Sequence, residues 1–186
     1  MRGYTVLKMI DNETGLTMTM GVQAKPQNPR LAENNLFQIV TWTKGLGDTH
    51  KWRTHEDFLS CIKTQDHLIY RLRKGENDRH TVLTVLHNNE APVIGYAFAH
   101  YDLLRLEFDQ PGDIGPDEVK RALDLLMVEL LAYEEYSTGQ VYSFAITDKT
   151  GKVLEKQGNI YGEDYAEHLA KEAFDNHRLG VSAREG

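Results

Sequence analysis

The stretch from residue 116 to residue 136 carries the longest helical pattern in the chain and constrains the fold more than any other segment. Its apolar side chains recur at helical spacing along one face, at Val119, Leu123, Leu126, Leu130 and Tyr133. Further apolar residues widen that face, namely Leu125, Val128 and Ala132. Because a helix with so broad an apolar surface must be covered on more than one side, we expect it to be the core helix, with sheet packed against it.

The remaining patterns predict mainly strands that come as hairpins. Residues 4–10 and 16–22 flank a glycine-closed turn, and residues 141–147 and 152–157 flank another. Further strands are predicted at 36–43, 67–73, 80–87, 93–101 and 103–108. Within the strand at 67–73, alternation predicts one shared face for His67, Ile69, Arg71 and Arg73. The segment 25–35 is expected to be a loop or at most one helical turn.

Two further helices are predicted, at 55–63 and 163–176. Thr54 is the expected N-cap of the first, whose inward residues would be Phe58, Cys61 and Ile62. The second would turn Tyr165, Leu169, Ala173 and Phe174 inward. Hairpins without βαβ alternation predict an α+β fold: a mostly antiparallel sheet built from hairpins, packed against the long core helix and a C-terminal helix.

The domain organisation follows from the same elements. A chain of 186 residues suits one domain, or one domain with a small appended unit. We predict a main α+β domain at 1–137, a ββα unit at 138–178 packed on it, and a flexible tail at 179–186. No stretch resembles a signal peptide or a membrane helix, and a single cysteine excludes an internal disulfide. The expected compartment is therefore the cytoplasm.

The net charge of −7 is spread unevenly. Residues 44–80 hold eight Lys/Arg against six Asp/Glu, whereas residues 101–176 hold seven Lys/Arg against seventeen Asp/Glu. An acidic chain argues against broad nucleic-acid binding, because such binding requires the neutralisation of phosphates. The acidic second half is interpreted as the solvated outer faces of helices.

Catalytic and metal motifs are missing from the sequence. No two of the eight histidines have the i, i+4 spacing of a helical metal pair or the i, i+2 spacing of a strand pair. No nucleophile elbow, Walker loop or Rossmann glycine pattern is present. Cys61 is expected to be a buried and inert thiol. We therefore predict no metal, no resident cofactor and no catalytic residues, and we lean against an enzyme.

One segment supports an alternative. The strands predicted at 80–87, 93–101 and 103–108 lead through the loop 109–115 to the core helix, and this loop contains Gln110, Gly112 and Gly115. This element order resembles the central part of GNAT acyltransferases, in which such a loop binds the acyl-CoA pyrophosphate at the helix N-terminus. Gln110 and Gly115 match the family pattern, while Asp113 replaces its middle glycine. The resemblance would make Gln110, Gly112 and Gly115 a binding site for acetyl-CoA; otherwise the glycines only shape a turn.

The loop before the short helix offers a recognition surface. Trp52 stands between Lys51 and Arg53, with His50 beside them, and Arg71 and Arg73 could extend this surface from the following strand. Such a cation–aromatic surface suits a nucleotide, a phosphate group or an acidic protein. In the opposing interpretation, Trp52 inserts into the core and the cations lie around it. The sequence does not decide between the two.

These observations favour a small non-enzymatic binding or regulatory protein. It would act through protein–protein contacts or by holding a small anionic ligand, with His50, Lys51, Trp52, Arg53, Arg71 and Arg73 as the binding residues. An accessory factor of a phage or mobile element would fit the size and character of the chain. A degenerate GNAT-like acyltransferase that uses acetyl-CoA is the alternative.

Overall fold

The structure is a computed structural model that describes residues 4–31, 35–75, 83–87 and 91–185. The chain forms two compact units. Unit 1 joins Met1–Asn28 to Glu135–Gly186, and unit 2 is Pro29–Glu134. Each unit contains one antiparallel four-stranded sheet with helices, so the predicted α+β class is confirmed. No helix within these described ranges is both long and apolar enough to cross a membrane.

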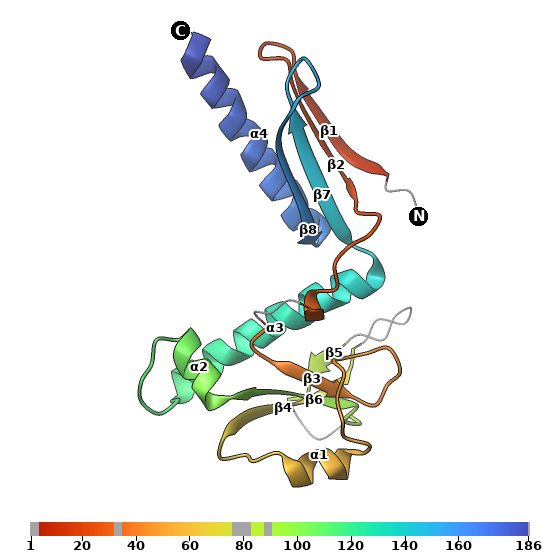
Figure 1. The fold of residues 1–186 in the computed structure, drawn as a ribbon, viewed down its shortest axis with the longest axis vertical. Helices are drawn as coiled ribbons and strands as arrows, with labels where there is room; N and C mark the ends of the chain where they lie inside the picture. The colour runs from red at the N-terminus through yellow and green to blue at the C-terminus, as the bar shows by residue number, and fades with distance from the viewer. Residues whose placement is uncertain (1–3, 32–34, 76–82, 88–90, 186) are drawn as a thin grey trace. The chain divides into compact units, whose positions relative to one another are not determined.

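Unit 1 is a meander of two hairpins with a helix along one face (Figure 1). Its strands are β1 (Thr5–Asp11), β2 (Leu16–Val22), β7 (Val141–Thr147) and β8 (Val153–Tyr161), paired in the order β1-β2-β7-β8. Both predicted hairpins are thus confirmed. The N-terminal hairpin pairs with the C-terminal one through β2 and β7. This pairing places residues 1–28 in the same unit as residues 135–186. The sequence analysis expected residues 1–28 to belong with the rest of 1–137.

The two hairpin turns of unit 1 lie side by side and are built alike. Asp11 accepts hydrogen bonds from the Glu13 amide and the Thr14 hydroxyl, and Asp148 accepts from the Thr150 amide and hydroxyl. The hydroxyl bond first, and then the amide bonds, lower the pKa of Asp11. Gly15 has φ +71°, and a Cβ there would lie 2.8 Å from the Cβ of Lys149. Glycine is therefore required at this position.

Helix α4 (Glu163–Glu185) covers β2, β7 and β8. Its buried residues are Ala166, Ala170 and Phe174, and they meet Met18, Phe144 and Ile146 of the sheet, among others. One prediction fails here. Tyr165, expected inward, is 59% exposed because the buried stripe follows Ala166 at i, i+4, i+8. Helix α4 is assigned as far as Glu185, and the flexible tail expected at 179–186 stays a prediction.

Unit 2 is a second sheet with helices on both faces (Figure 1). Its strands are β3 (Gln38–Thr41), β4 (His67–Lys74), β5 (Leu83–Val85) and β6 (Gly95–His100), in the order β3-β6-β4-β5. Its helices are η1 (Pro29–Leu31), α1 (His55–Cys61), α2 (Tyr101–Glu107) and the part of α3 (Pro116–Thr138) that ends at Glu134. The strand predicted at 80–87 is present at β5, and its first residues lie outside the described ranges.

The faces of the unit 2 sheet follow strand alternation. On one face the Tyr70 hydroxyl donates to the Val119 carbonyl of α3 at 3.0 Å. On the other face Phe58 of α1 stacks on Tyr96 of β6. Directly opposed residues of an antiparallel pair share a face, and Arg71 is opposite Tyr96. Arg71 and Arg73 therefore lie on the α1 face, as the alternation predicted.

Three expectations for unit 2 are wrong. The strand predicted at 103–108 is helix α2, whose first turn is capped by His100, with its Nδ1 accepting from the Asp102 amide. Cys61 is exposed at the end of α1, not buried. The exposed fractions of Met127, Val128 and Leu131 are 41%, 65% and 56%, so α3 is not covered on more than one side.

Candidate functional site

The predicted binding loop lies along the open edge of β3. The Asp48 amide donates to the Ile39 carbonyl, and the Asp48 carboxylate accepts from the Ile39 amide. Two residues further on, the His50 Nε2 lies 2.8 Å from the Thr41 carbonyl. Residues 48–50 thus take the hydrogen bonds that a neighbouring strand would take. An edge strand with unpaired backbone groups invites unwanted pairing, and this loop prevents it.

A buried ion cluster anchors the same loop. The Arg30 guanidinium donates to both oxygens of Asp48, at 2.8 and 3.0 Å, and to Glu129 of α3 at 2.6 Å. Its side chain is only 3% exposed. Burial alone lowers the pKa of Arg30, but the hydrogen bonds and charges of Asp48 and Glu129 outweigh burial and raise it. Arg30 stays charged. Its bonds to Asp48 hold the start of the binding loop in place beside β3.

An aromatic–histidine layer covers the α1 face of the unit 2 sheet. We define it as Trp42, His50, Trp52, His55, Phe58, Tyr96 and Phe98. Its centroid separations are 3.9 Å for Trp42–His55, 5.7 Å for His55–Tyr96, 5.6 Å for Trp42–His50 and 5.2 Å for Trp52–Phe58. Phe58 is fully buried, while the two tryptophans and the two histidines are half-buried. Part of the layer is therefore accessible from solvent.

The cations predicted for the site surround this layer. Lys51 lies with its Nζ 5.8 Å from the centre of the Trp52 ring, and Lys51 and Arg53 are both exposed. Arg71 is exposed opposite Tyr96. Burial raises the pKa of Tyr96, and the positive charge of Arg71 opposes that rise. Arg73 follows on the same face, with one guanidinium nitrogen near the Lys74 carbonyl. All six predicted residues thus belong to the α1 side of the sheet.

Both interpretations of Trp52 hold in part. The indole is half-buried against Phe58 and Phe98, so it does insert into the core. Two polar atoms in this region of the described structure are buried without a hydrogen-bond partner, Nδ1 of His50 and Nε1 of Trp52. The Nε2 of His50 faces a carbonyl, which only accepts, so this nitrogen donates. The rings of His50 and Trp52 therefore each hold one buried nitrogen without a hydrogen-bond partner.

The glycine loop of the acyltransferase alternative has a different environment from the one that the resemblance implies. The Gly115 amide donates to the Glu118 carboxylate at 3.0 Å, so a carboxylate already caps the start of α3. The Gly112 carbonyl accepts from the Arg105 guanidinium, and the Gln110 amide donates to the Arg105 carbonyl. The element before this loop is a helix and not a strand. The loop is ordered by its own chain, with acidic groups around it.

The sequence analysis did not identify Trp42 or His55 as part of this face, and it did not identify the contact between His67 and His100. His67 of β4 lies opposite His100 of β6, with ring centroids 4.9 Å apart. The Nδ1 of His67 is 2.9 Å from the Lys63 carbonyl. Spacing along one strand could not reveal a pair formed across two strands. Within the described residues, no group of three or more His, Cys, Asp or Glu side chains is placed to hold a metal ion.

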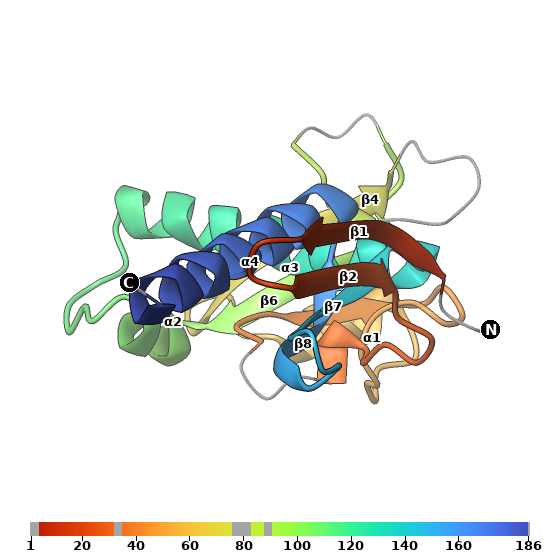
Figure 2. The ribbon, with the colours of Figure 1, turned by 90° about the horizontal axis from the view of Figure 1, so that it is seen from above.

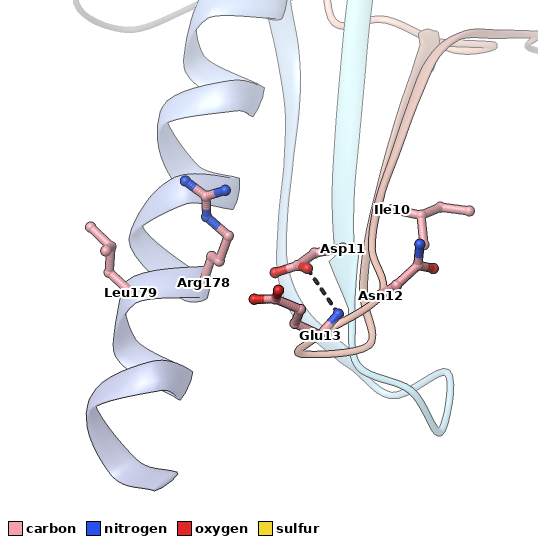
Figure 3. A pocket seen from close by; sticks show the side chains of 6 residues that line it. All are labelled: Ile10, Asp11, Asn12, Glu13, Arg178 and Leu179. Carbon is pink, nitrogen blue, oxygen red and sulfur yellow. Dashed lines mark hydrogen bonds between the residues drawn. The ribbon is translucent and has the colours of Figure 1, made fainter. Parts of the chain in front are cut away.

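Unit 1 has an open polar pocket of about 610 Å³ at its turn end (Figure 3). The Asp11 and Glu13 carboxylates point toward α4, from which Arg178 extends, while the side chains of Ile10 and Leu179 point away from this space. Arg178 pairs with Asp175 at 3.1 Å. Asp11 already accepts hydrogen bonds within its turn, so one of the two carboxylates of the pocket is taken up by the turn itself.

Comparisons with protein-family models, with curated proteins and with solved structures each find no match for this chain.

Proposed function

We propose that the protein is a small non-enzymatic binding protein that recognises an anionic partner through the α1 face of unit 2. The observation that carries this proposal is the arrangement of Lys51, Arg53 and Arg71 around half-exposed aromatic rings. Cations beside aromatic faces bind carboxylates and phosphates while the rings contact apolar or planar groups. The cations alone would attract an anion without contacting its apolar parts, and the aromatic rings alone would not attract its charge.

The partner that fits this face best is an acidic segment of another protein. Aromatic residues and arginine are enriched where proteins meet, because they bury area and donate hydrogen bonds together. The unpartnered Nδ1 of His50 and Nε1 of Trp52 could then be satisfied by backbone groups of the bound segment. A small anionic ligand that binds the same cations and rings is the second candidate for the partner.

The setting that we propose is the cytoplasm, as a regulatory accessory factor of the kind that a phage or mobile element encodes. The exposed thiol of Cys61 supports a reducing compartment, because an exposed free cysteine persists there. The protein would regulate its target by binding an acidic site on that target through the α1 face of unit 2.

The test is capture of partners from a host extract by the immobilised full chain, with native mass spectrometry to identify bound polypeptides or small anions. Arg53→Glu combined with Arg71→Glu reverses two exposed charges and leaves Trp52 in place, so the fold should persist. We expect this variant to lose the captured species. Lys120→Glu on α3 is the matched control with the same kind of charge change and should retain it. Equal capture by all three proteins would contradict the proposed surface.

Calorimetry with acetyl-CoA addresses the alternative. The capped start of α3 and the carboxylates around it lead us to expect no heat of binding at millimolar cofactor. Saturable binding that Gly115→Leu abolishes would instead favour the acyltransferase-like role.

A further inference from the structure

The face of the unit 1 sheet opposite α4 has a composition unlike the rest of the unit. Leu16, Met18 and Met20 of β2 point into the core with α4, so Thr17 and Thr19 lie on the other face. Pairing extends this open face across all four strands. One row is Lys8, Thr19, Ala145 and Lys156, and the next is Ile10, Thr17, Thr147 and Val153. Figure 2 shows β1 and β2 side by side, with α4 to one side of them.

All the charge in these two rows is positive. Lys8 and Lys156 are exposed at the two outer strands, and between them stand only threonine and alanine. The acidic residues of the strands are on the α4 side: Glu155 is opposite Ile146 and bonds His177 of α4, and Asp11 is opposite Leu16. An acidic protein thus presents a sheet face with threonines in its centre, bordered by two lysines in one row and by exposed Ile10 and Val153 in the next.

We infer that this open face binds duplex DNA, with the two lysines on phosphates at either side of the major groove. Phosphate contacts in proteins come mainly from Lys, Arg and hydroxyl side chains. Protein interfaces are instead enriched in aromatic residues and arginine and depleted in lysine, serine and alanine. A single-stranded nucleic acid would need aromatic stacking platforms, and the two rows contain none. The composition therefore favours a duplex.

The dimensions agree with this assignment. Lys8 and Lys156 are separated by three strand spacings, which is about 14 Å at about 4.8 Å per spacing. The major groove of B-form DNA is about 12 Å wide, so cations at this separation reach phosphates on both strands. The small side chains of β2 and β7 allow the backbone of the sheet to approach the groove. A-form RNA has a narrow major groove, so two cations about 14 Å apart do not match the phosphates on either side of it.

The number of contacts sets the expected strength. Two lysine–phosphate contacts in a protein with a net charge of −7 give weak, sequence-independent binding, with a dissociation constant of roughly 10⁻⁴ M at low salt. Each contact releases counterions, so raising the salt from about 50 to about 200 mM should weaken binding roughly 12-fold. Because this face belongs to unit 1, its test is independent of the proposed function in unit 2.

The experiment is fluorescence anisotropy of the full chain with a labelled DNA duplex of about two helical turns. Lys8→Glu and Lys156→Glu should each weaken binding at least tenfold, while circular dichroism confirms that both variants fold. Lys171→Glu makes the same change of charge on exposed α4 and should alter binding less than threefold. Single-stranded DNA, duplex RNA and poly-glutamate serve as competitors, and each should compete at least tenfold less well than duplex DNA.

Several results would overturn the inference. They are absence of binding at low salt, equal loss on Lys171→Glu and Lys8→Glu, and a competitor that matches the duplex. A match by poly-glutamate would assign the face to an acidic protein instead. Lys8→Gln and Lys156→Gln remove charge without reversing it, so they should show about half the loss in binding free energy. If they show none, repulsion by the introduced glutamates, and not loss of a contact, explains the first variants.

Discussion

The two units bury the interior of a four-stranded sheet in different ways. In unit 1 the buried side chains of the described residues are apolar apart from the Tyr142 hydroxyl, and strand alternation against one helix is enough to place them. In unit 2 the buried set includes Arg30 and Thr41, and the edge of β3 is completed by side chains from a loop. Unit 1 is thus stabilised by a repeated local pattern. Unit 2 depends on polar contacts between segments that are distant in sequence.

This difference implies different responses to mutation. An apolar core loses stability gradually as methylene groups are removed. A buried ion cluster loses stability abruptly, because removal of one partner leaves the others charged and desolvated. Both tryptophans of the chain are in unit 2, so their fluorescence reports unfolding of unit 2 alone. Hydrogen exchange of β7 amides reports unit 1.

The largest effect should come from Arg30→Met. It leaves Asp48 and Glu129 without their cation, and we expect the free energy of unfolding of unit 2 to fall by about 3 kcal/mol. Urea unfolding followed by tryptophan fluorescence measures this loss, while exchange of β7 amides should not change. Arg178→Met is the matched control in unit 1, where an exposed pair with Asp175 should contribute less than about 1 kcal/mol. A loss below 1 kcal/mol for Arg30→Met would show that the cluster does not hold unit 2.

The next effect concerns two glycines of the loop that borders β3. Gly45 and Gly47 both have positive φ, at +81° and +76°, but only Gly47 also lacks space, since a Cβ would lie 2.8 Å from the Ile39 carbonyl. Gly45→Ala should cost about 1 kcal/mol for backbone strain alone. Gly47→Ala should cost more, about 2–3 kcal/mol, because the loop must also move from the edge of β3. The same fluorescence measurement compares them, and equal losses would mean that the loop is not held against the strand.

The comparison also explains which parts of the fold the sequence predicts. Both hairpins of unit 1 follow from alternating residues and turn chemistry that lie within one short segment. Pairing of β2 with β7 joins residues more than a hundred positions apart, and nothing in either strand specifies its partner. Helix α2 was mistaken for a strand because its few apolar residues also alternate. Its helical state depends on the cap that His100 supplies.

The candidate site was predictable to a similar degree. The six predicted residues are found on one side of the unit 2 sheet because alternation on β4 and the loop before α1 are local features. Trp42 and His55 were not foreseen, since their stacking depends on how the loop returns along β3. The Arg30–Asp48–Glu129 cluster is formed by three separate segments, and their charges look like ordinary surface residues in the sequence.

The next prediction concerns the apolar cores, where we expect a smaller loss of stability that is equal in the two units. Ile39 of unit 2 and Ile146 of unit 1 are both fully buried. Replacing either by valine removes one methylene, which should cost about 0.5–1.5 kcal/mol in its own unit. Fluorescence measures the first and hydrogen exchange the second. Similar losses would show that the apolar cores are equivalent and that the units differ in their polar contacts. A loss in unit 2 that is several times larger would contradict this view.

The smallest effect is a dependence of stability on pH, which arises from one buried tyrosine in each unit. Burial raises the pKa of Tyr70 in unit 2 to about 12, with smaller contributions from Tyr101 and Asp124. Burial also raises the pKa of Tyr142 in unit 1 to about 12, and there the second cause is the hydrogen bond to Glu163. In each case the folded state holds its proton more tightly than the unfolded chain. The stabilisation is therefore complete below about pH 10 and is lost as the pH rises toward 12.

Titration of tyrosinate absorbance tests this difference between the units. In the wild type Tyr70 and Tyr142 should both ionise near pH 12, and Tyr70→Phe and Tyr142→Phe should each remove one ionisation from this range. Glu163→Gln takes away the negative charge that faces the Tyr142 hydroxyl, so it should lower the pKa of Tyr142 and leave that of Tyr70 unchanged. If Glu163→Gln changes neither pKa, burial alone controls both tyrosines. The polar contact would then not distinguish Tyr142 from Tyr70.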